Sequence, residues 1–199
     1  MAALSAGCDY VTIAAPAQVA WTINCLCPDL VTIKCPGDYL KKQGTILQGR
    51  YDAVLIGNGL AKTGIPFARR IIPKISKPLV IDGDAIGCLS LDRLDDTLLT
   101  PHAGEYQRLE GDIGTNCILL KGATDQIMTK AKTYKNRTGN PYMTRAGTGD
   151  ILAGICAALR SQGYTAVEAT RKAAYINGKA APKRPFLAEE HLASIRRLF

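Results

Sequence analysis

A short glycine-rich segment carries the residues of this chain that are best suited to chemistry. Residues 139–150 read Gly-Asn-Pro-Tyr-Met-Thr-Arg-Ala-Gly-Thr-Gly-Asp, and an apolar run over 151–159 follows without a proline. The pattern predicts a glycine-rich loop that opens a buried helix. Glycines let the backbone approach a ligand closely, and the free N–H groups at a helix start favour an anion. Asp150 would lie beside that anion, where a carboxylate can act as a general base.

The same residues also fit a simpler interpretation, in which Asp150 only caps the helix. Four other polar or glycine segments end short apolar runs, and each alone fits an ordinary turn: Gly57-Asn58-Gly59, Asp82-Gly83-Asp84, Pro101-His102 and Lys121-Gly122. Gly57 and Gly59 do not complete a dinucleotide fingerprint, because position 62 is lysine. Lys121 does not belong to a G-x-x-x-x-G-K-[ST] phosphate loop, which the sequence lacks.

The elements that must position these residues alternate along the chain. Apolar and turn patterns predict strands over 10–14, 30–34, 53–56, 79–81, 97–100 and 117–120, a hairpin over 126–128 and 132–135, and helices over 16–24, 62–75, 150–162, 165–179 and 189–198. Pro66 and Pro73 are expected to break the second helix. The alternation predicts an α/β fold with a mainly parallel central sheet and helices on both faces. Ligands of such sheets bind at the carboxyl ends of the strands, where the polar segments fall.

Composition limits the classes of protein. The chain has 199 residues, a length that fits one domain over 1–199. Its net charge is +8. Its basic residues are dispersed pairs, and no aromatic RNA-reading motif occurs, so we expect a solvated basic surface and no nucleic-acid partner. The pairs are Lys41-Lys42, Arg69-Arg70, Arg171-Lys172, Lys183-Arg184 and Arg196-Arg197.

The apolar runs are too short to span a membrane, and the seven cysteines lack paired spacing, so we expect a cytoplasmic protein without membrane, disulfide or metal site. Cys25, Cys27 and Cys35 are the one alternative metal cluster, and it lacks a fourth ligand.

Several ordered blocks resemble the ADP/ATP-dependent NAD(P)H-hydrate dehydratases, which have a ribokinase-like fold. They are 54–60 (Val-Leu-Ile-Gly-Asn-Gly-Leu), 80–85 (Val-Ile-Asp-Gly-Asp-Ala), 99–105 (Leu-Thr-Pro-His-Ala-Gly-Glu), 119–124 (Leu-Leu-Lys-Gly-Ala-Thr) and 138–154, which contains Thr-Gly-Asn-Pro and Gly-Thr-Gly-Asp. The third and fifth blocks separate this family from the sugar and vitamin kinases of the same fold.

The resemblance implies a metabolite-repair lyase that uses a nucleotide phosphate donor to dehydrate the S-form of NADH or NADPH hydrate. It implies that Gly59, His102 and Asp150 face the hydrated nicotinamide, with Asp150 as the base. The implied nucleotide site, for ADP or ATP with Mg²⁺, consists of Lys121, Gly122, Ala123, Thr124, Asp125 and Gly149. The amides of Gly147, Thr148 and Gly149 would hold the phosphoryl oxygens.

The sequence departs from the family pattern in three places. Ala146 replaces one glycine of the usual pair before Thr148, and Arg145 and Tyr142 lie in the same loop, so the phosphate cradle is expected to be tighter or shifted. Gly83 stands where a small non-glycine residue is usual, and little effect is expected. Residues 1–7 resemble the end of the family's first long helix, without the preceding strand and glycine-serine loop.

That short start favours a fragment, a mis-started reading frame or a divergent short form. A sheet without its first strand would expose an apolar face and an unpaired edge, so we expect a homo-oligomer. Two other functions stay open. One is a non-catalytic ADP-binding protein or subunit derived from the family, and the other is a small-molecule kinase of the same fold.

Overall fold

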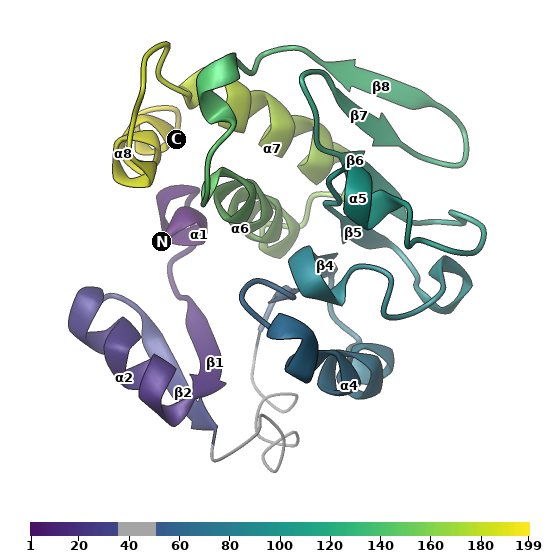
Figure 1. The fold of residues 1–199 in the computed structure, drawn as a ribbon, viewed down its shortest axis with the longest axis horizontal. Coiled ribbons are helices and arrows are strands. Elements are labelled where there is room, and N and C mark those ends of the chain that lie inside the picture. Colours follow the sequence, from purple (N-terminus) through teal and green to yellow (C-terminus); the bar gives the residue numbers. More distant parts are fainter. Residues whose placement is uncertain (36–50) are drawn as a thin grey trace.

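A computed structural model describes residues 1–35 and 51–199, and its strands form two separate sheets (Figure 1). The smaller sheet is a parallel pair, β1 (Thr12–Pro16) and β2 (Val31–Cys35), connected by α2 (Ala17–Leu26). The larger sheet has the strand order β3-β4-β5-β6-β7-β8. Its strands are β3 (Val54–Ile56), β4 (Leu79–Ile81), β5 (Thr97–Leu99), β6 (Cys117–Leu120), β7 (Asp125–Met128) and β8 (Thr133–Asn136).

The larger sheet is parallel from β3 to β6 and antiparallel from β6 to β8. The mainly parallel sheet predicted from the sequence is therefore confirmed. The alternation had not indicated that β1 and β2 would form a sheet of their own. Because the four parallel strands run side by side in chain order, the segments that follow β3, β4, β5 and β6 meet at one edge of the sheet.

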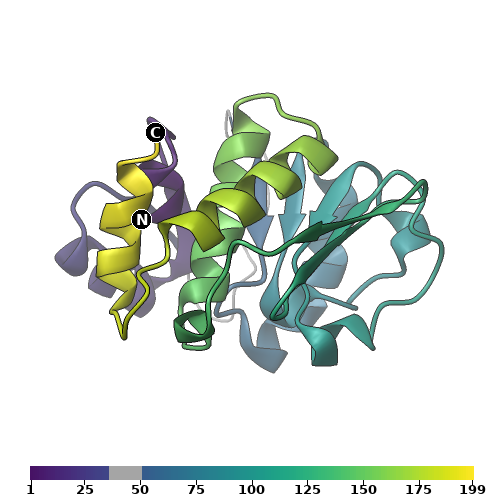
Figure 2. The same ribbon diagram turned by 90° about the horizontal axis from the view of Figure 1, so that it is seen from above.

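Helices cover both faces of the larger sheet (Figures 1 and 2). One core contains Val80, Leu98 and Leu119 from the strands, together with apolar residues of α6 (Thr148–Ser161) and α7 (Ala166–Ala180). The neighbouring strand residues face the opposite core, formed with α4 (Ala61–Ile71). Each fully buried leucine or isoleucine contributes about 1.5–3 kcal/mol by leaving water, so these two layers hold the strand ends in place.

Shorter elements complete the chain: α1 (Ala2–Ser5), α5 (Ala103–Tyr106), α8 (Ala188–Arg196) and the 3₁₀ turns η1 (Ile72–Lys74), η2 (Gly83–Ala85), η3 (Leu91–Arg93) and η4 (Pro141–Met143). Residues 1–7 were predicted to end a helix, and α1 packs there against α6. Gly154 permits this approach, since a Cβ at that position would lie 2.7 Å from the Ala2 Cβ.

The helix predicted over 62–75 differs from the structure in one respect. Pro66 does not break it: α4 continues to Ile71, and Pro73 lies in η1. The buried residues Gly64, Phe67, Ala68 and Ile71 follow the spacing of one helical face, while Pro66 is exposed. Burial of that face against the sheet compensates for the one backbone hydrogen bond that the proline removes.

The surface agrees with the predicted dispersal of basic residues. Arg69-Arg70, Arg171-Lys172, Lys183-Arg184 and Arg196-Arg197 are all exposed, and Lys41-Lys42 lies outside the described residues. Within 1–35 and 51–199, no helix combines the length and apolar character needed to cross a bilayer.

Candidate active site at the strand ends

A buried carboxylate at the end of one parallel strand contacts residues at the ends of the three others. Asp82 directly follows β4 and is only 3% exposed. Its Oδ1 accepts hydrogen bonds from the Thr100 hydroxyl at 2.6 Å and from the Lys121 ammonium at 3.0 Å. Its Oδ2 accepts from the Asn58 amide at 2.7 Å. These partners follow β5, β6 and β3, so one side chain connects the whole parallel part of the sheet.

Asp150 lies in the first turn of α6, exposed at the same edge. Its Oδ1 accepts a hydrogen bond of 2.6 Å from Asn58 Nδ2, the atom that also donates to Asp82. Its Oδ2 has no hydrogen-bond partner among the described residues. One oxygen is therefore held, while the other is available to accept a proton from a bound molecule.

Glycine is required at the turn after β3. Gly57 has φ +121°, and a Cβ there would lie 1.7 Å from the Asp82 carbonyl oxygen. The backbone after β3 thus packs directly on the backbone after β4. Gly59 has φ +63°, and a Cβ there would meet no other atom of the described residues within 4 Å, so this predicted substrate residue borders open space.

His102 acts as a helix cap in this structure. Its Nδ1 accepts from the backbone N–H groups of Gly104 and Glu105, and the Glu105 carboxylate accepts from the His102 N–H at 2.8 Å. Glu105 is buried, and its Oε2 lies 4.0 Å from Lys121 Nζ. A parallel bridge pairs His102 with Lys121. The imidazole is mostly exposed at the strand-end edge, with Nε2 3.4 Å from a Glu105 oxygen.

The predicted nucleotide residues form the turn between β6 and β7. Asp125 Oδ1 accepts from the Gly122 N–H at 3.2 Å, and its Oδ2 accepts from the Asn136 amide at 3.0 Å. Burial raises the pKa of the Asp125 carboxyl, although both hydrogen bonds oppose that shift. Ala123 is exposed and Thr124 half-buried in this turn. Gly149 reaches it from α6, since a Cβ at 149 would lie 3.4 Å from Lys121 Nζ.

Side-chain hydrogen bonds of Asn140 and Thr148 hold the glycine-rich loop in place. Asn140 caps η4 and donates to the carbonyls of Ala181 and Pro182, and the Thr148 hydroxyl donates to Met143 and Arg145 carbonyls at 2.9 Å. Gly147, with φ +89°, is the N-cap residue that precedes α6.

Of the residues that depart from the family pattern, Tyr142 and Ala146 are exposed, and the Arg145 guanidinium lies 5.3 Å from the centre of the Phe186 ring. Gly83 has φ +55°, and a Cβ there would lie 3.1 Å from the Gly57 carbonyl oxygen. The glycine at this position therefore accommodates the close approach of the two turns.

The structure brings Gly59, His102 and Lys121, which the strand-end pattern had indicated, to one edge together with Gly149 and Asp150 of the glycine-rich segment. Asn58 and Asp82 stand in the polar strand-end segments noted in the sequence, but no role was assigned to them, and Thr100 and Glu105 were not identified as members of the site. A signal was present for all four, since each directly follows a strand or stands in the Thr-Pro-His-Ala-Gly-Glu block. Their joint role depends on which strands are neighbours, which the sequence pattern does not specify.

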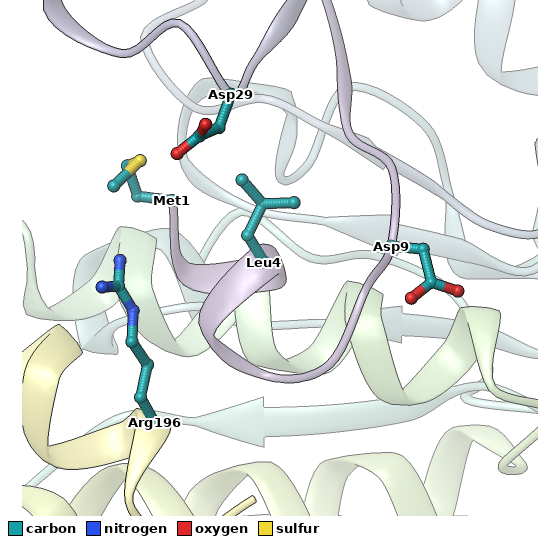
Figure 3. A pocket seen from close by; sticks show the side chains of 5 residues that line it. All are labelled: Met1, Leu4, Asp9, Asp29 and Arg196. Carbon is teal, nitrogen blue, oxygen red and sulfur yellow. The ribbon is translucent and has the colours of Figure 1, made fainter.

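A separate hollow of about 490 Å³ lies elsewhere, between α1, the α2–β2 connection and α8 (Figure 3). It is lined by Met1, Leu4, Asp9, Asp29 and Arg196, none of which was predicted to bind or react. Cys8, Cys25, Cys27, Cys88, Cys117 and Cys156 are free thiols, and Cys25 is the exposed one of these six. In the two described stretches, no group of three or more His, Cys, Asp or Glu residues could hold a metal ion.

Comparisons with known proteins agree with this geometry. A family model described as NAD(P)H-hydrate dehydratase matches residues 1–194. The ADP-dependent (S)-NAD(P)H-hydrate dehydratase of Cenarchaeum symbiosum is 35% identical over 90% of this chain and 72% of that protein. The bifunctional NAD(P)H-hydrate repair enzyme Nnr of Methanothermobacter thermautotrophicus is 33% identical over 90% of this chain. The chain spans only 41% of the length of that relative.

Among solved structures, the ADP/ATP-dependent NAD(P)H-hydrate dehydratase of Bacillus subtilis, co-crystallised with ATP and Mg²⁺ and soaked with CoA, superposes with a TM-score of 0.82. The two are 22% identical, and the match covers 99% of this chain and 83% of the other. Likeness of this kind confirms the ribokinase-like α/β fold predicted from the sequence.

Proposed function

We propose, from the premise that this chain belongs to the NAD(P)H-hydrate dehydratase family, that it restores NADH or NADPH from the S-form of the hydrated cofactor. ADP or ATP would be the phosphate donor, as the names of related proteins indicate for them. The reaction makes the chain a carbon–oxygen lyase of metabolite repair. The observation that carries the proposal is the Asp150 carboxylate, with one oxygen held by Asn58 and the other open beside a glycine-rich helix start.

The chemistry explains why a base and a phosphate cradle belong together. Hydroxide is a poor leaving group at neutral pH. ADP or ATP supplies the phosphoryl group that converts the ring hydroxyl into a phosphate ester, and its own terminal P–O bond breaks. Asp150 takes the hydroxyl proton through Oδ2 as that ester forms. The C–O bond then breaks with the ring nitrogen's lone pair, phosphate leaves, and the adjacent carbon loses a proton to complete the double bond.

The chain's remaining site residues would orient the two reactants. The N–H groups of Gly147, Thr148 and Gly149 lie at the start of α6, where helix N-termini favour phosphate. Lys121 is fixed against this turn and would neutralise the donor phosphates, while Gly122, Ala123, Thr124 and Asp125 would line the nucleotide site. Gly59 and His102, at the ends of β3 and β5, would face the nicotinamide.

Mg²⁺ would enter with the nucleotide. The described residues offer no acidic cluster that fits a protein-built cage, since Asp82 is buried with its oxygens already bonded. Magnesium commonly keeps several waters and binds through substrate phosphates, so it does not need a cluster of protein carboxylates here. Its contribution would be to neutralise phosphate charge.

One assay tests the function against its two rivals. Purified protein is incubated with ADP, Mg²⁺ and S-form NADH hydrate, and the absorbance of reduced nicotinamide is followed. Recovery of NADH with release of phosphate supports the dehydratase. A phosphorylated product that accumulates would indicate a kinase, and tight ADP binding without turnover would indicate a binding protein.

We also propose that the chain forms a homo-oligomer in the cytoplasm. Apolar side chains gather on the unit of α2 and β2: Val19, Trp21, Leu26 and Val31 are all exposed, Trp21 at 60% and Leu26 at 81%. Exposed large apolar side chains are a feature of protein interfaces. Six free thiols, those of Cys8, Cys25, Cys27, Cys88, Cys117 and Cys156, agree with a reducing compartment. Light scattering at several concentrations measures the mass, and a monomer at all of them would contradict the assembly.

A further inference from the structure

We propose that Asp82 is a positioning residue that acts on both reactants: it holds the Asp150 base through Asn58 and holds the Lys121 ammonium directly. This inference rests on the proposed function, because it assigns the role of Asp82 within that site. Asp82 is buried, so this role requires no contact between its carboxylate and either reactant. It lies one layer beneath the strand-end surface, at the end of β4.

Because Asp82 is buried, its carboxylate depends on hydrogen bonds from neighbouring side chains. A buried carboxylate needs partners for its oxygens, because an unpaired charge away from water is costly. Both oxygens are occupied by side chains, with Thr100 and Lys121 on Oδ1 and Asn58 on Oδ2. These three partners come from three different strand ends. Asp82 therefore sets the relative position of groups that no local turn could align.

Asn58 transmits this position to the base. Its Nδ2 donates to Asp82 at 2.7 Å and to Asp150 at 2.6 Å, so its two amide hydrogens are shared between two carboxylates. With Asp82 anchored by burial, Asn58 has one orientation that satisfies both acceptors. That orientation fixes Oδ1 of Asp150, and hence the direction in which its unbonded Oδ2 points.

Lys121 is held in the same way on the nucleotide side. Its ammonium lies 3.0 Å from Asp82 Oδ1 and 4.0 Å from Glu105 Oε2, next to the first turn of α6. A lysine side chain has four rotatable bonds and loses much freedom when it binds an anion. Contacts with two carboxylates place the ammonium before the phosphates arrive, which lowers that entropic cost.

A purely structural role for Asp82 predicts a different pattern. If the carboxylate only stabilised the turn after β4, its loss would lower the free energy of unfolding without a separate effect on turnover or ADP binding. The positioning role instead predicts two effects that can be separated by substitution. Asn58 connects Asp82 to the base only, whereas Asp82 also contacts Lys121.

The experiment compares Asn58→Ala, Asp82→Asn and the control Asn24→Ala, each checked for folding by circular dichroism. Asn24 also makes two hydrogen bonds through its amide, with Leu30 and Thr32, far from the strand ends. Asn58→Ala should lower kcat by about tenfold or more, because small misplacements of reacting groups are costly. Its Kd for ADP should stay within about twofold, because Lys121 remains paired with Asp82.

Asp82→Asn should lower kcat similarly and also weaken ADP binding by about fivefold or more, measured by calorimetry. Asn24→Ala should change neither quantity. Normal kcat in Asn58→Ala, or unchanged ADP affinity in a folded Asp82→Asn protein, would overturn the inference. If Asp82→Asn does not fold, Asp82→Glu takes its place, since it keeps the charge but moves the oxygens.

Failure of the proposed function would look different. A wild-type chain that binds ADP but yields no reduced nicotinamide would refute the dehydratase, and the calorimetric comparison of the Asp82 and Asn58 variants would still decide the inference. A wild-type chain that does not bind ADP at all would overturn both.

Discussion

The two ends of the larger sheet use buried polar side chains in different ways. At the carboxyl ends, Asp82 is bonded to three other side chains, and the network reaches an exposed carboxylate with an unbonded oxygen. At the amino ends, Arg160 donates to the backbone carbonyls of Tyr164 and Asp96 at 2.9 Å and to the Asp96 carboxylate at 2.6 Å. Asn116 bonds only backbone groups there, those of Leu91, Leu94 and Thr97.

The difference separates stability from function. Bonds from a side chain to the backbone close loops and satisfy groups that would otherwise be buried without partners. At the carboxyl ends of the strands, hydrogen bonds between side chains align Asn58, Lys121 and Asp150 at the surface of the site. Helix α6 connects the two ends, since Asp150 lies in its first turn and Arg160 in its last. Substitutions at these two positions should therefore affect different properties.

The largest expected effect is that of Asp150→Asn on turnover. Asparagine keeps the size and the oxygen that accepts from Asn58, but removes the basicity. We expect kcat to fall by roughly 10²–10⁴-fold, the range typical for loss of a general base. ADP affinity and the free energy of unfolding should be nearly unchanged, because the side chain is exposed. Steady-state kinetics with calorimetry measures both, and near-normal turnover would remove Asp150 from this role.

Arg160→Met should show the opposite pattern. It leaves the carbonyls of Tyr164 and Asp96 without their donor, so we expect a loss of about 3 kcal/mol in the free energy of unfolding. The kcat of the folded fraction should be unchanged. Urea unfolding gives the first quantity, with Arg197→Met at an exposed position as the control. Full stability with impaired turnover would contradict the separation of the two ends.

Gly149→Val tests the nucleotide side of the strand-end site. A valine Cβ would meet Lys121 Nζ at 3.4 Å, and its methyl groups would occupy the space that a phosphate or ribose needs. We expect ADP affinity to fall by about tenfold, or about 1.4 kcal/mol. Because the contact is with the flexible end of a lysine, the protein should still fold. Unchanged ADP affinity in a folded variant would move the nucleotide elsewhere.

The smallest expected effect concerns His191, a buried side chain that is hydrogen-bonded to the backbone. It is fully buried, with Nε2 2.9 Å from the Asn177 carbonyl and Nδ1 unpaired in the described residues. Burial lowers the pKa of His191, and the bond to Asn177 partly opposes this. The folded state therefore favours the neutral ring, and its contribution to stability is present above about pH 6.5 and lost as pH falls through the lowered pKa.

We expect the free energy of unfolding to fall by on the order of 1 kcal/mol between about pH 7 and pH 5 through this group. His191→Gln keeps a donor for the Asn177 carbonyl but does not titrate, so the fall should be smaller in that variant. Urea unfolding at both pH values measures the difference. Equal pH dependence in the two proteins would rule out His191 as its source.

Local patterns predicted most of the elements but not how they combine. Strand β4 was expected over 79–81 and lies there, because a short apolar run bounded by turn residues has few alternatives. Pro66 was expected to end a helix, and burial of the face around Phe67 prevented that. That β1 pairs only with β2, and not with the larger sheet, is a property of the tertiary structure, which periodicity does not encode.

The site was predictable residue by residue but not as a network. Glycine and polar residues at strand ends pointed to Gly59, His102 and Lys121, and the glycine-rich segment before a helix pointed to Asp150. The link between Asp82 and Lys121 spans 39 positions and depends on the strand order β4-β5-β6. Strand order is a tertiary property, and the importance of Asp82 became visible only with it.

The pairing of Asp82 with Lys121 also has a consequence for descent. Losing Lys121 alone leaves the buried Asp82 carboxylate without its counterion, and losing Asp82 alone leaves Lys121 with only the Glu105 carboxylate, 4.0 Å away, so each single loss is more damaging than replacing both. Lineages derived from this protein should therefore retain both residues or exchange both together, with few single-substitution intermediates. A lineage that has abandoned the reaction is free to make that double exchange, so neutral residues at both positions would mark a descendant that keeps the fold but has left catalysis behind.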